Sequence, residues 1–451
     1  MKLQKITIFS MVVGLSLSGC ASFSSDGGIG DVRKSTEQRI KQEVVWSKTA
    51  QEQKQSADRV NALLNNSLDV DDAVQIALLN NKGLQASLYD LGISEADVVQ
   101  AGRLPNPKFS MLYARNNGDY KIEQALTFNI FSLLTMPTVL AIERKNFEKT
   151  KQKVALDVLK LAYQTRIAYF NAVAARQHVH YSQQVKESAQ ASAELAKRMV
   201  KAGNWSTLEQ AQEQRYYAQA VQEAIESSQQ QISKLEILSR LLGVAPDMIK
   251  LQDRLPVLPE STAELKTIEA TAFEQRLDLQ ATRQETNQLA KQLGLTKTTR
   301  LINVLEVGPA RVLEGKRGDA YKKGVDISFE LPLFDWGSAK VAHAEATYMQ
   351  AVNRSAQLAF NAQSEIREAH QRYLNSYEIA KQYRDEIVPL SKKVSDENLL
   401  RYNGMLISPF TLFADARAQV VSVNAYITQL NEFWLAETAL NMSLIGSLGD
   451  Q

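Results

Sequence analysis

Cysteine and histidine are scarce in this chain of 451 residues, which has one cysteine, Cys20, and four histidines. A single cysteine excludes an internal disulfide and any metal site built from several thiolates. His178 and His180 are two residues apart on a predicted helix and so face different directions, whereas His343 and His370 stand alone. No phosphate-binding loop or nucleophile motif is present either. The sequence predicts no catalytic centre, no cofactor site and no metal site.

Long hydrophobic runs and an excess of charge are also missing. After the first twenty residues, no apolar run reaches the roughly 18 residues that a transmembrane helix needs. The chain has 52 basic and 50 acidic residues, and the two counts become equal without Lys2 and Lys5. A neutral chain offers no basic surface, so we expect no nucleic-acid partner. If the protein crosses a membrane, its strands must close into a barrel.

The first residues are typical of a lipoprotein signal peptide, predicted over 1–19. Two lysines precede an apolar run at 6–17, which is too short to span a bilayer, and residues 17–20 read LSGC. This pattern predicts that Cys20 becomes a lipid-modified N-terminus, which makes 20–66 a lipidated tether. The covalent lipid is then the only attached group. The alternative is an ordinary signal peptide that happens to end near a cysteine.

A regular spacing of small and apolar residues organises the rest of the chain. Steps of four and three residues lead from Val154 to Val200 and on to Gly203, which is the spacing of a coiled-coil helix. Adding 201 to each position gives a second series that ends at Gly404. The sequence therefore predicts a duplicated unit of about two hundred residues, built on long helical hairpins.

This duplication divides the chain into predicted segments. The first repeat, at 67–243, has a helix, strands near 108–131 and a hairpin at 138–243. A linker at 244–264 leads to the second repeat, at 265–446, which has a helix, strands near 300–333 and a hairpin at 338–446. A tail follows at 447–451.

The predicted strands alternate between apolar and polar residues. Val325, Ile327, Phe329 and Leu331 share one face of the last strand, and Asp326, Ser328 and Glu330 share the other. Such alternation is typical of a soluble sheet that covers a core and of a barrel strand that faces lipid. Two observations favour the lipid-facing interpretation: little else in the chain can pack on these strands, and the chain carries an export signal.

Several motifs give the chain a family resemblance. Residues 100–107 (QAGRLPNP) lead into the first strand, residues 331–337 (LPLFDWG) end the last one, and each hairpin tip has a glycine followed by a serine. With the duplication, these features resemble the outer membrane factor family, the TolC-like efflux ducts. The resemblance implies a mostly α fold with a small β part, in which three copies with four strands each form a twelve-stranded barrel and an α-helical periplasmic tunnel.

The resemblance also implies a function and a location. It implies a passive exit duct in the outer membrane of a Gram-negative cell, which receives substrates from a periplasmic adaptor and an inner-membrane pump. Ala21 after the lipidated position favours the outer membrane, because the resemblance associates retention in the inner membrane with an Asp there. The alternative function is a lipid-anchored structural coiled-coil protein of the envelope, without a channel.

The hairpin tips carry the candidate site. We expect the two tip glycines to turn the chain, and we expect adaptor contacts from Gly203, Ser206, Gly404, Met405, Leu406 and Ser408. The family resemblance places an acidic residue soon after each tip, where it narrows the tunnel, and Glu209 matches that position. In the second tip the corresponding position is Phe410 or Thr411, so Asp415 is the nearest acid. The alternative is that Glu209 only stabilises a helix start.

Overall fold

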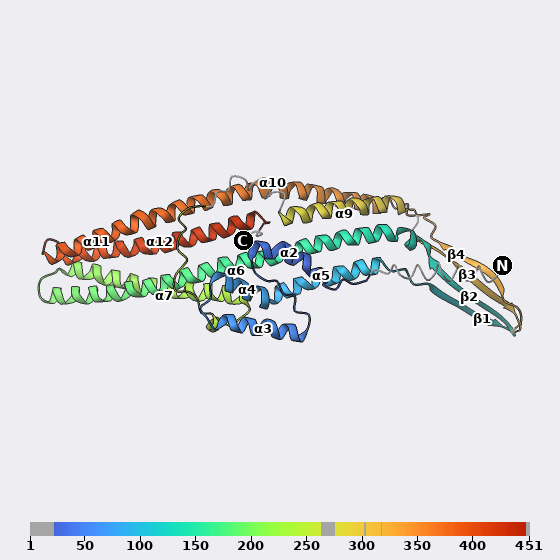
Figure 1. Ribbon diagram of the computed structural model, residues 1–451, viewed down its shortest axis with the longest axis horizontal. Helices are drawn as coiled ribbons and strands as arrows, with labels where there is room; N and C mark the ends of the chain where they lie inside the picture. Colours follow the sequence, from blue (N-terminus) through green and yellow to red (C-terminus); the bar gives the residue numbers. More distant parts are fainter. Residues whose placement is uncertain (1–21, 263–275, 302–303, 317, 448–451) are drawn as a thin grey trace. The chain divides into compact units, whose positions relative to one another are not determined.

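The computed structural model describes residues 22–262, 276–301, 304–316 and 318–447. The predicted signal peptide and Cys20 lie outside these residues. Helices dominate the described chain and four strands form one sheet, which confirms the mostly α fold class with a small β part (Figure 1). No described helix combines the length and the apolar character that a membrane span requires. The chain forms two compact units.

The first unit contains the sheet and comprises the described residues up to Val32, Leu88–Val154 and Asp278–Ala359. Its strands pair antiparallel with their sequence neighbours, in the order β1-β2-β3-β4 (Figure 1). The bounds are β1 Lys108–Asn116, β2 Asp119–Asn129, β3 Leu305–Gly315 and β4 Lys322–Phe329. All four strands fall within the two predicted stretches.

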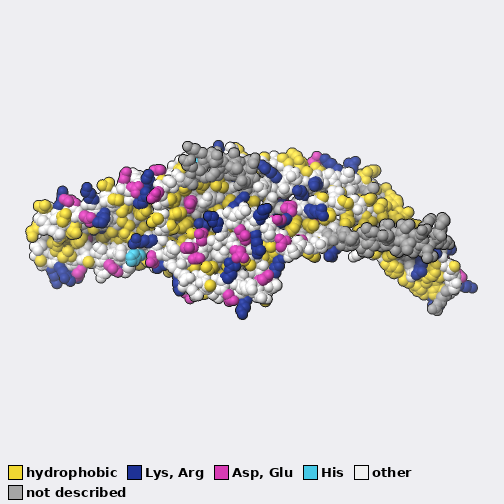
Figure 2. Space-filling model, in the orientation of Figure 1, with side chains coloured by type: hydrophobic (Ala, Val, Ile, Leu, Met, Phe, Trp, Pro, Cys, Tyr) yellow, Lys and Arg dark blue, Asp and Glu magenta, His cyan; other side chains and the backbone are white. Residues whose placement is uncertain are grey.

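The strand register separates an apolar face of the sheet from a polar face. Phe109 pairs with Leu126, Phe128 with Val307, and Val307 with Ile327. Because side chains alternate along a strand, these residues lie on one side. Four of these side chains are exposed, from 38% for Leu126 to 64% for Phe109, and Val307 is half-buried. The other face holds pairs such as Glu306 with Ser328. The predicted alternation therefore extends across the sheet, and hydrophobic side chains are prominent on the strands in view (Figure 2).

The second unit comprises Arg33–Ser87, Ala155–Leu277 and the described residues from Phe360. The helix predicted at the start of the first repeat begins with α4 (Val70–Asn80), which Asp69 caps in a box with Asp72. It is not one unbroken helix, because Asn81 is extended and a new helix, α5 (Lys82–Ala101), follows. The Asn81 side-chain amide instead donates to the Leu241 carbonyl, at the end of another helix.

The predicted tether is more structured than its polar composition indicates. It includes α2 (Ile29–Ile40) and α3 (Ala50–Leu64), and Thr49 caps α3 in a box with Glu52. Val44 is fully buried. The few apolar residues of this segment are thus used for packing.

Two helical hairpins form most of the second unit, and the first helix of each begins in the first unit. The first consists of α6 (Ile130–Lys201) and α7 (Thr207–Leu242); the second consists of α10 (Ser338–Gln382), the π-helical turn η3 (Tyr383–Ile387), α11 (Val388–Asn403) and α12 (Pro409–Ser443). The first begins earlier than the predicted residue 138. The predicted spacing in α6 marks its buried side: Val154, Val158, Thr165 and Ala196 have no exposed area.

The predicted spacing does not mark the buried side of α11, at the end of the first arm of the second hairpin. Leu390 and Val394, expected on the buried side, are 59% and 52% exposed. Half-buried positions occur one residue later, at Ser391, Ser395 and Asn398. The π-helical turn η3 accounts for the shift, because a π turn accommodates one residue more than an α turn. Relative to the first hairpin, one residue has been inserted into a continuous helix.

Candidate functional site at the hairpin tips

Gly203 turns the first tip. It has a left-handed φ of 75°, and its N–H donates to the Val200 carbonyl at 3.0 Å. The N–H of Asn204 donates to the Met199 carbonyl at 2.9 Å, which closes the end of α6. A Cβ on Gly203 would meet nothing within 4 Å, so the backbone conformation itself favours glycine here.

The second tip has the same hydrogen bonds, one residue later than predicted. The N–H of Met405 donates to the Tyr402 carbonyl at 2.9 Å, and the N–H of Leu406 donates to the Arg401 carbonyl at 2.8 Å. The left-handed residue is Met405, with φ 58°, whereas Gly404 has an ordinary φ of −80°. The prediction that Gly404 makes the left-handed turn is therefore wrong. The inserted residue at η3 changes the offset between the tips from 201 to 202.

Serines begin both return helices. Ser206 accepts a hydrogen bond from the Glu209 N–H at 3.2 Å, and the Glu209 carboxylate accepts from the Ser206 N–H at 2.8 Å. Ser408 accepts from the Thr411 N–H at 3.2 Å. Glu209 thus forms a capping box, and Thr411 takes the same place in the second tip without a charge. The alternative role of Glu209 at a helix start accounts for its contacts within the chain.

Apolar side chains project from the second tip. Met405 is 93% exposed and Leu406 is 77% exposed. Leu208 in the first tip is 66% exposed. Large apolar side chains left in water favour a surface that contacts another protein.

Asp415 lies further from its tip than Glu209 does. It is half-buried, and its carboxylate accepts a hydrogen bond from the Asn398 side-chain amide. With an offset of 202, its counterpart in the first hairpin is Glu213 rather than Glu209. The two constriction candidates therefore occupy different levels of their hairpins.

Glu213 and Arg417 form a buried link between the hairpins that the sequence prediction missed. Glu213 is fully buried and accepts hydrogen bonds from the Ser192 hydroxyl at 2.5 Å and from the Arg417 guanidinium at 3.2 Å. The guanidinium also lies 4.5 Å from the centre of the Tyr216 ring. The sequence does contain a signal for this pair. An acidic residue is followed two positions later by arginine in both return helices, as Glu213-Gln214-Arg215 and Asp415-Ala416-Arg417.

Metal ligands do not cluster in the described residues. No group of three or more His, Cys, Asp or Glu side chains there could hold a metal ion.

Comparisons with known proteins agree with this architecture. Residues 73–244 match the family of outer membrane efflux proteins. The fold is similar to that of the outer-membrane channel OprN, with a TM-score of 0.69 and 16% identity over 92% of this chain and 96% of that one. It is also similar to VceC from Vibrio cholerae, with a TM-score of 0.67 and 14% identity over 84% and 96% of the two chains.

A third similar structure is the open state of the MtrE outer membrane channel from Neisseria gonorrhoeae. The TM-score is 0.67 and the identity 14%, over 86% of this chain and 89% of that one. No curated protein matches the sequence. The family match confirms the resemblance noted from the sequence. The chain is similar to the outer membrane efflux proteins over residues 73–244, and it has the fold of the TolC-like outer-membrane channels.

Proposed function

We propose that this protein is the passive outer-membrane exit duct of a tripartite efflux system. In this proposal three copies form the duct, a periplasmic adaptor contacts its helical tips, and an inner-membrane pump supplies the substrates. The family match supports an efflux channel component of the outer membrane. The observation that carries the proposal is the incomplete sheet, which has one apolar face and two unpaired edges.

The unpaired edges favour a trimer. In the described chain, β1 and β4 each have a neighbour on one side only. Open edges leave backbone groups without hydrogen bonds, which lipid does not tolerate. If β4 of one copy pairs with β1 of the next, three copies of a four-stranded sheet close into twelve strands. The apolar face then meets lipid, and the polar face lines the lumen.

Exposed apolar residues on α11 support contacts between copies. Leu390, Val394, Leu399 and Leu400 are 49–67% exposed. The shift at η3 accounts for the exposure of Leu390 and Val394, because the half-buried positions move to Ser391 and Ser395. Burying this surface against a neighbouring copy would stabilise the helical part of a trimer.

The remaining predictions belong to the same proposal. Cys20 carries a lipid that anchors the chain in the outer membrane. Gly203, Ser206, Gly404, Met405, Leu406 and Ser408 contact the adaptor. Glu209 and Asp415 narrow the periplasmic mouth, where threefold rings of carboxylates would favour cations.

The strand faces provide the test. Ile327→Arg should cost about 2–4 kcal/mol near mid-bilayer, because Ile327 faces lipid in the trimer. Ser328→Arg is the matched control on the neighbouring, lumen-facing position. We expect a heat-modifiable trimer and stepwise conductance in planar bilayers from the wild type and from S328R, with a marked loss of trimer in I327R.

The opposite ranking of the two variants would contradict the proposed strand faces. A purified protein that migrates as a monomer without boiling and gives no conductance would favour the structural coiled-coil alternative. That alternative accounts for the helices and the anchor but not for the two faces of the sheet.

A further inference from the structure

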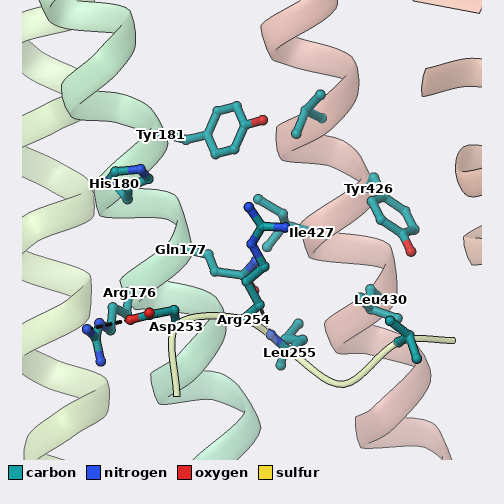
Figure 3. A pocket seen from close by; sticks show the side chains of 12 residues that line it. Arg176, Gln177, His180, Tyr181, Asp253, Arg254, Leu255, Tyr426, Ile427 and Leu430 are labelled. Carbon is teal, nitrogen blue, oxygen red and sulfur yellow. Dashed lines mark hydrogen bonds and ion pairs between the residues drawn. The ribbon is translucent and has the colours of Figure 1, made fainter. Parts of the chain in front are cut away.

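A cavity of about 600 Å³ lies within the second unit, away from the tips. It is bounded by α6, α12 and a stretch of the linker, residues 253–257 (Figure 3). Its apolar lining includes Leu255, Ile427 and Leu430, which are 4–6% exposed. The volume is typical of sites that take small organic ligands.

The linker wall of this cavity is held in place by side chains from both hairpins. Arg176 on α6 donates to the Leu251 carbonyl at 2.6 Å, and the Gln177 side-chain carbonyl accepts from the Leu255 N–H at 3.0 Å. Trp434 on α12 donates to the Pro256 carbonyl at 3.0 Å. Because the wall is fixed by hydrogen bonds from two helices, the cavity is formed before any ligand enters.

The charges that line the cavity do not cancel. The Arg176 guanidinium is paired with the Asp253 carboxylate at 2.7 Å. Arg254 forms no hydrogen bond or ion pair with any of the described residues, and its guanidinium stands between α6 and α12 (Figure 3). No other lysine, arginine or carboxylate lines the cavity. The lining therefore has one uncompensated positive charge, which complements a ligand with one negative charge.

An aromatic side chain faces the same space. The Tyr181 ring extends from α6 toward α12 (Figure 3). Flat aromatic groups pack favourably against such a ring and against an apolar floor. We propose that this cavity binds a small aromatic monoanion, with its carboxylate or sulfonate on Arg254 and its ring system between Tyr181 and Ile427. The proposed exit-duct function does not require this site.

The experiment uses the full-length protein in nanodiscs of phosphatidylcholine, titrated calorimetrically with 2-naphthoate. We expect saturable binding of one molecule per chain. Arg254→Gln should weaken it at least about tenfold, because it removes a charge-assisted hydrogen bond. Arg254 forms no hydrogen bond or ion pair within the described chain, so the variant should keep its thermal unfolding temperature. Arg215→Gln is the control: it removes an exposed arginine of α7 that does not line the cavity.

Two further probes define the ligand class: one has no charge, and the other has no aromatic ring. Neutral 2-naphthamide should bind the wild type at least about tenfold more weakly than 2-naphthoate does. Its affinity for R254Q should equal its affinity for the wild type. Decanoate should compete poorly, since it has the charge but no ring. Equal affinities of R254Q and R215Q for 2-naphthoate, or no saturable binding by the wild type, would overturn the site. Decanoate that competes as well as 2-naphthoate would overturn its aromatic specificity.

Discussion

Gly203 and Met405 occupy the same place in the two hairpin tips. Each has a left-handed φ, 75° and 58°, and each donates its N–H to the carbonyl three residues earlier. The residue types differ because the second hairpin has one extra residue at η3, so its glycine falls one position before the turn. Met405 therefore bears the conformational cost that glycine avoids.

The tips provide the first prediction. Met405→Gly should stabilise the second tip by about 1 kcal/mol, because glycine adopts a positive φ without steric cost. Gly203→Val should destabilise the first tip by a similar amount or more. Gly404→Ala is the control and should have little effect, since the φ of Gly404 is −80°. Thermal unfolding temperatures measure all three. A larger loss in G404A than in G203V would contradict this account of the tips.

The second prediction concerns the buried link between the hairpins. Arg417→Met leaves the Glu213 carboxylate buried without its cation, which should cost about 3–5 kcal/mol. Adding Glu213→Gln to that variant should restore part of the stability, because the uncompensated charge is gone. A double-mutant cycle in chemical denaturation measures the coupling. Additive effects of the two substitutions would show that the pair contributes no specific interaction.

The third prediction is a pH dependence of stability from His178 on α6. Burial lowers the pKa of His178 below its ordinary value of 6.5, although the nearby Asn424 side chain and the charge of Glu223 act in the opposite direction. The unfolded chain therefore binds a proton more readily than the folded one, so the contribution of His178 is complete above pH 6.5 and declines as the pH falls through the lowered pKa. His178→Gln should remove this part of the decline, as measured by unfolding between pH 7.5 and pH 5. An unchanged pH slope in the variant would assign the decline to other groups.

The fourth prediction compares two glycines of the sheet. A Cβ on Gly308 would collide with the Leu126 carbonyl of the neighbouring strand, whereas a Cβ on Gly324 meets nothing within 4 Å. Gly308→Ala should therefore disturb the pairing of β2 with β3, at a cost of at least about 1–3 kcal/mol. Gly324→Ala should be tolerated. The yield of heat-modifiable trimer should fall in G308A alone; equal yields would show that the strands separate easily at this point.

The fifth prediction tests Glu209 at the proposed mouth. Glu209→Lys should lower the cation selectivity of single channels, because a threefold ring of carboxylates becomes a ring of ammonium groups. Glu226→Lys, a reversal on the same helix much further from the tip, is the control. The reversal potential in a salt gradient measures the effect. An unchanged potential in E209K would leave Glu209 with its role in the capping box alone.

Regular patterns in the sequence predicted the parts of the fold that repeat. The buried side of α6 and the two faces of the sheet follow from residue spacing, because each depends on local geometry that recurs along the chain. The cap at Asp69 is a local feature of the same kind, since an N-cap depends on a few neighbouring residues. The family resemblance came from the duplication and two strand-flanking motifs, and the match of residues 73–244 confirms it.

The rest depends on contacts that spacing does not encode. The π-helical turn η3 moves the second tip by one residue, and nothing in the spacing before Tyr383 indicates where the insertion lies. The link between Glu213 and Arg417 joins residues 204 positions apart, so only the tertiary structure brings them together. The break at Asn81 likewise depends on the Leu241 carbonyl, in a distant part of the chain.

The extra residue at η3 also bears on how a duplicated gene can diversify. Each residue of an α-helix rotates the chain by about 100°. One added residue therefore presents a different set of side chains to the surroundings along all of α11, while the hydrogen bonds that close the tip are preserved. If the two hairpins arose by duplication, one added codon is enough to give them different surfaces. A partner that approached both tips would meet two related but different surfaces.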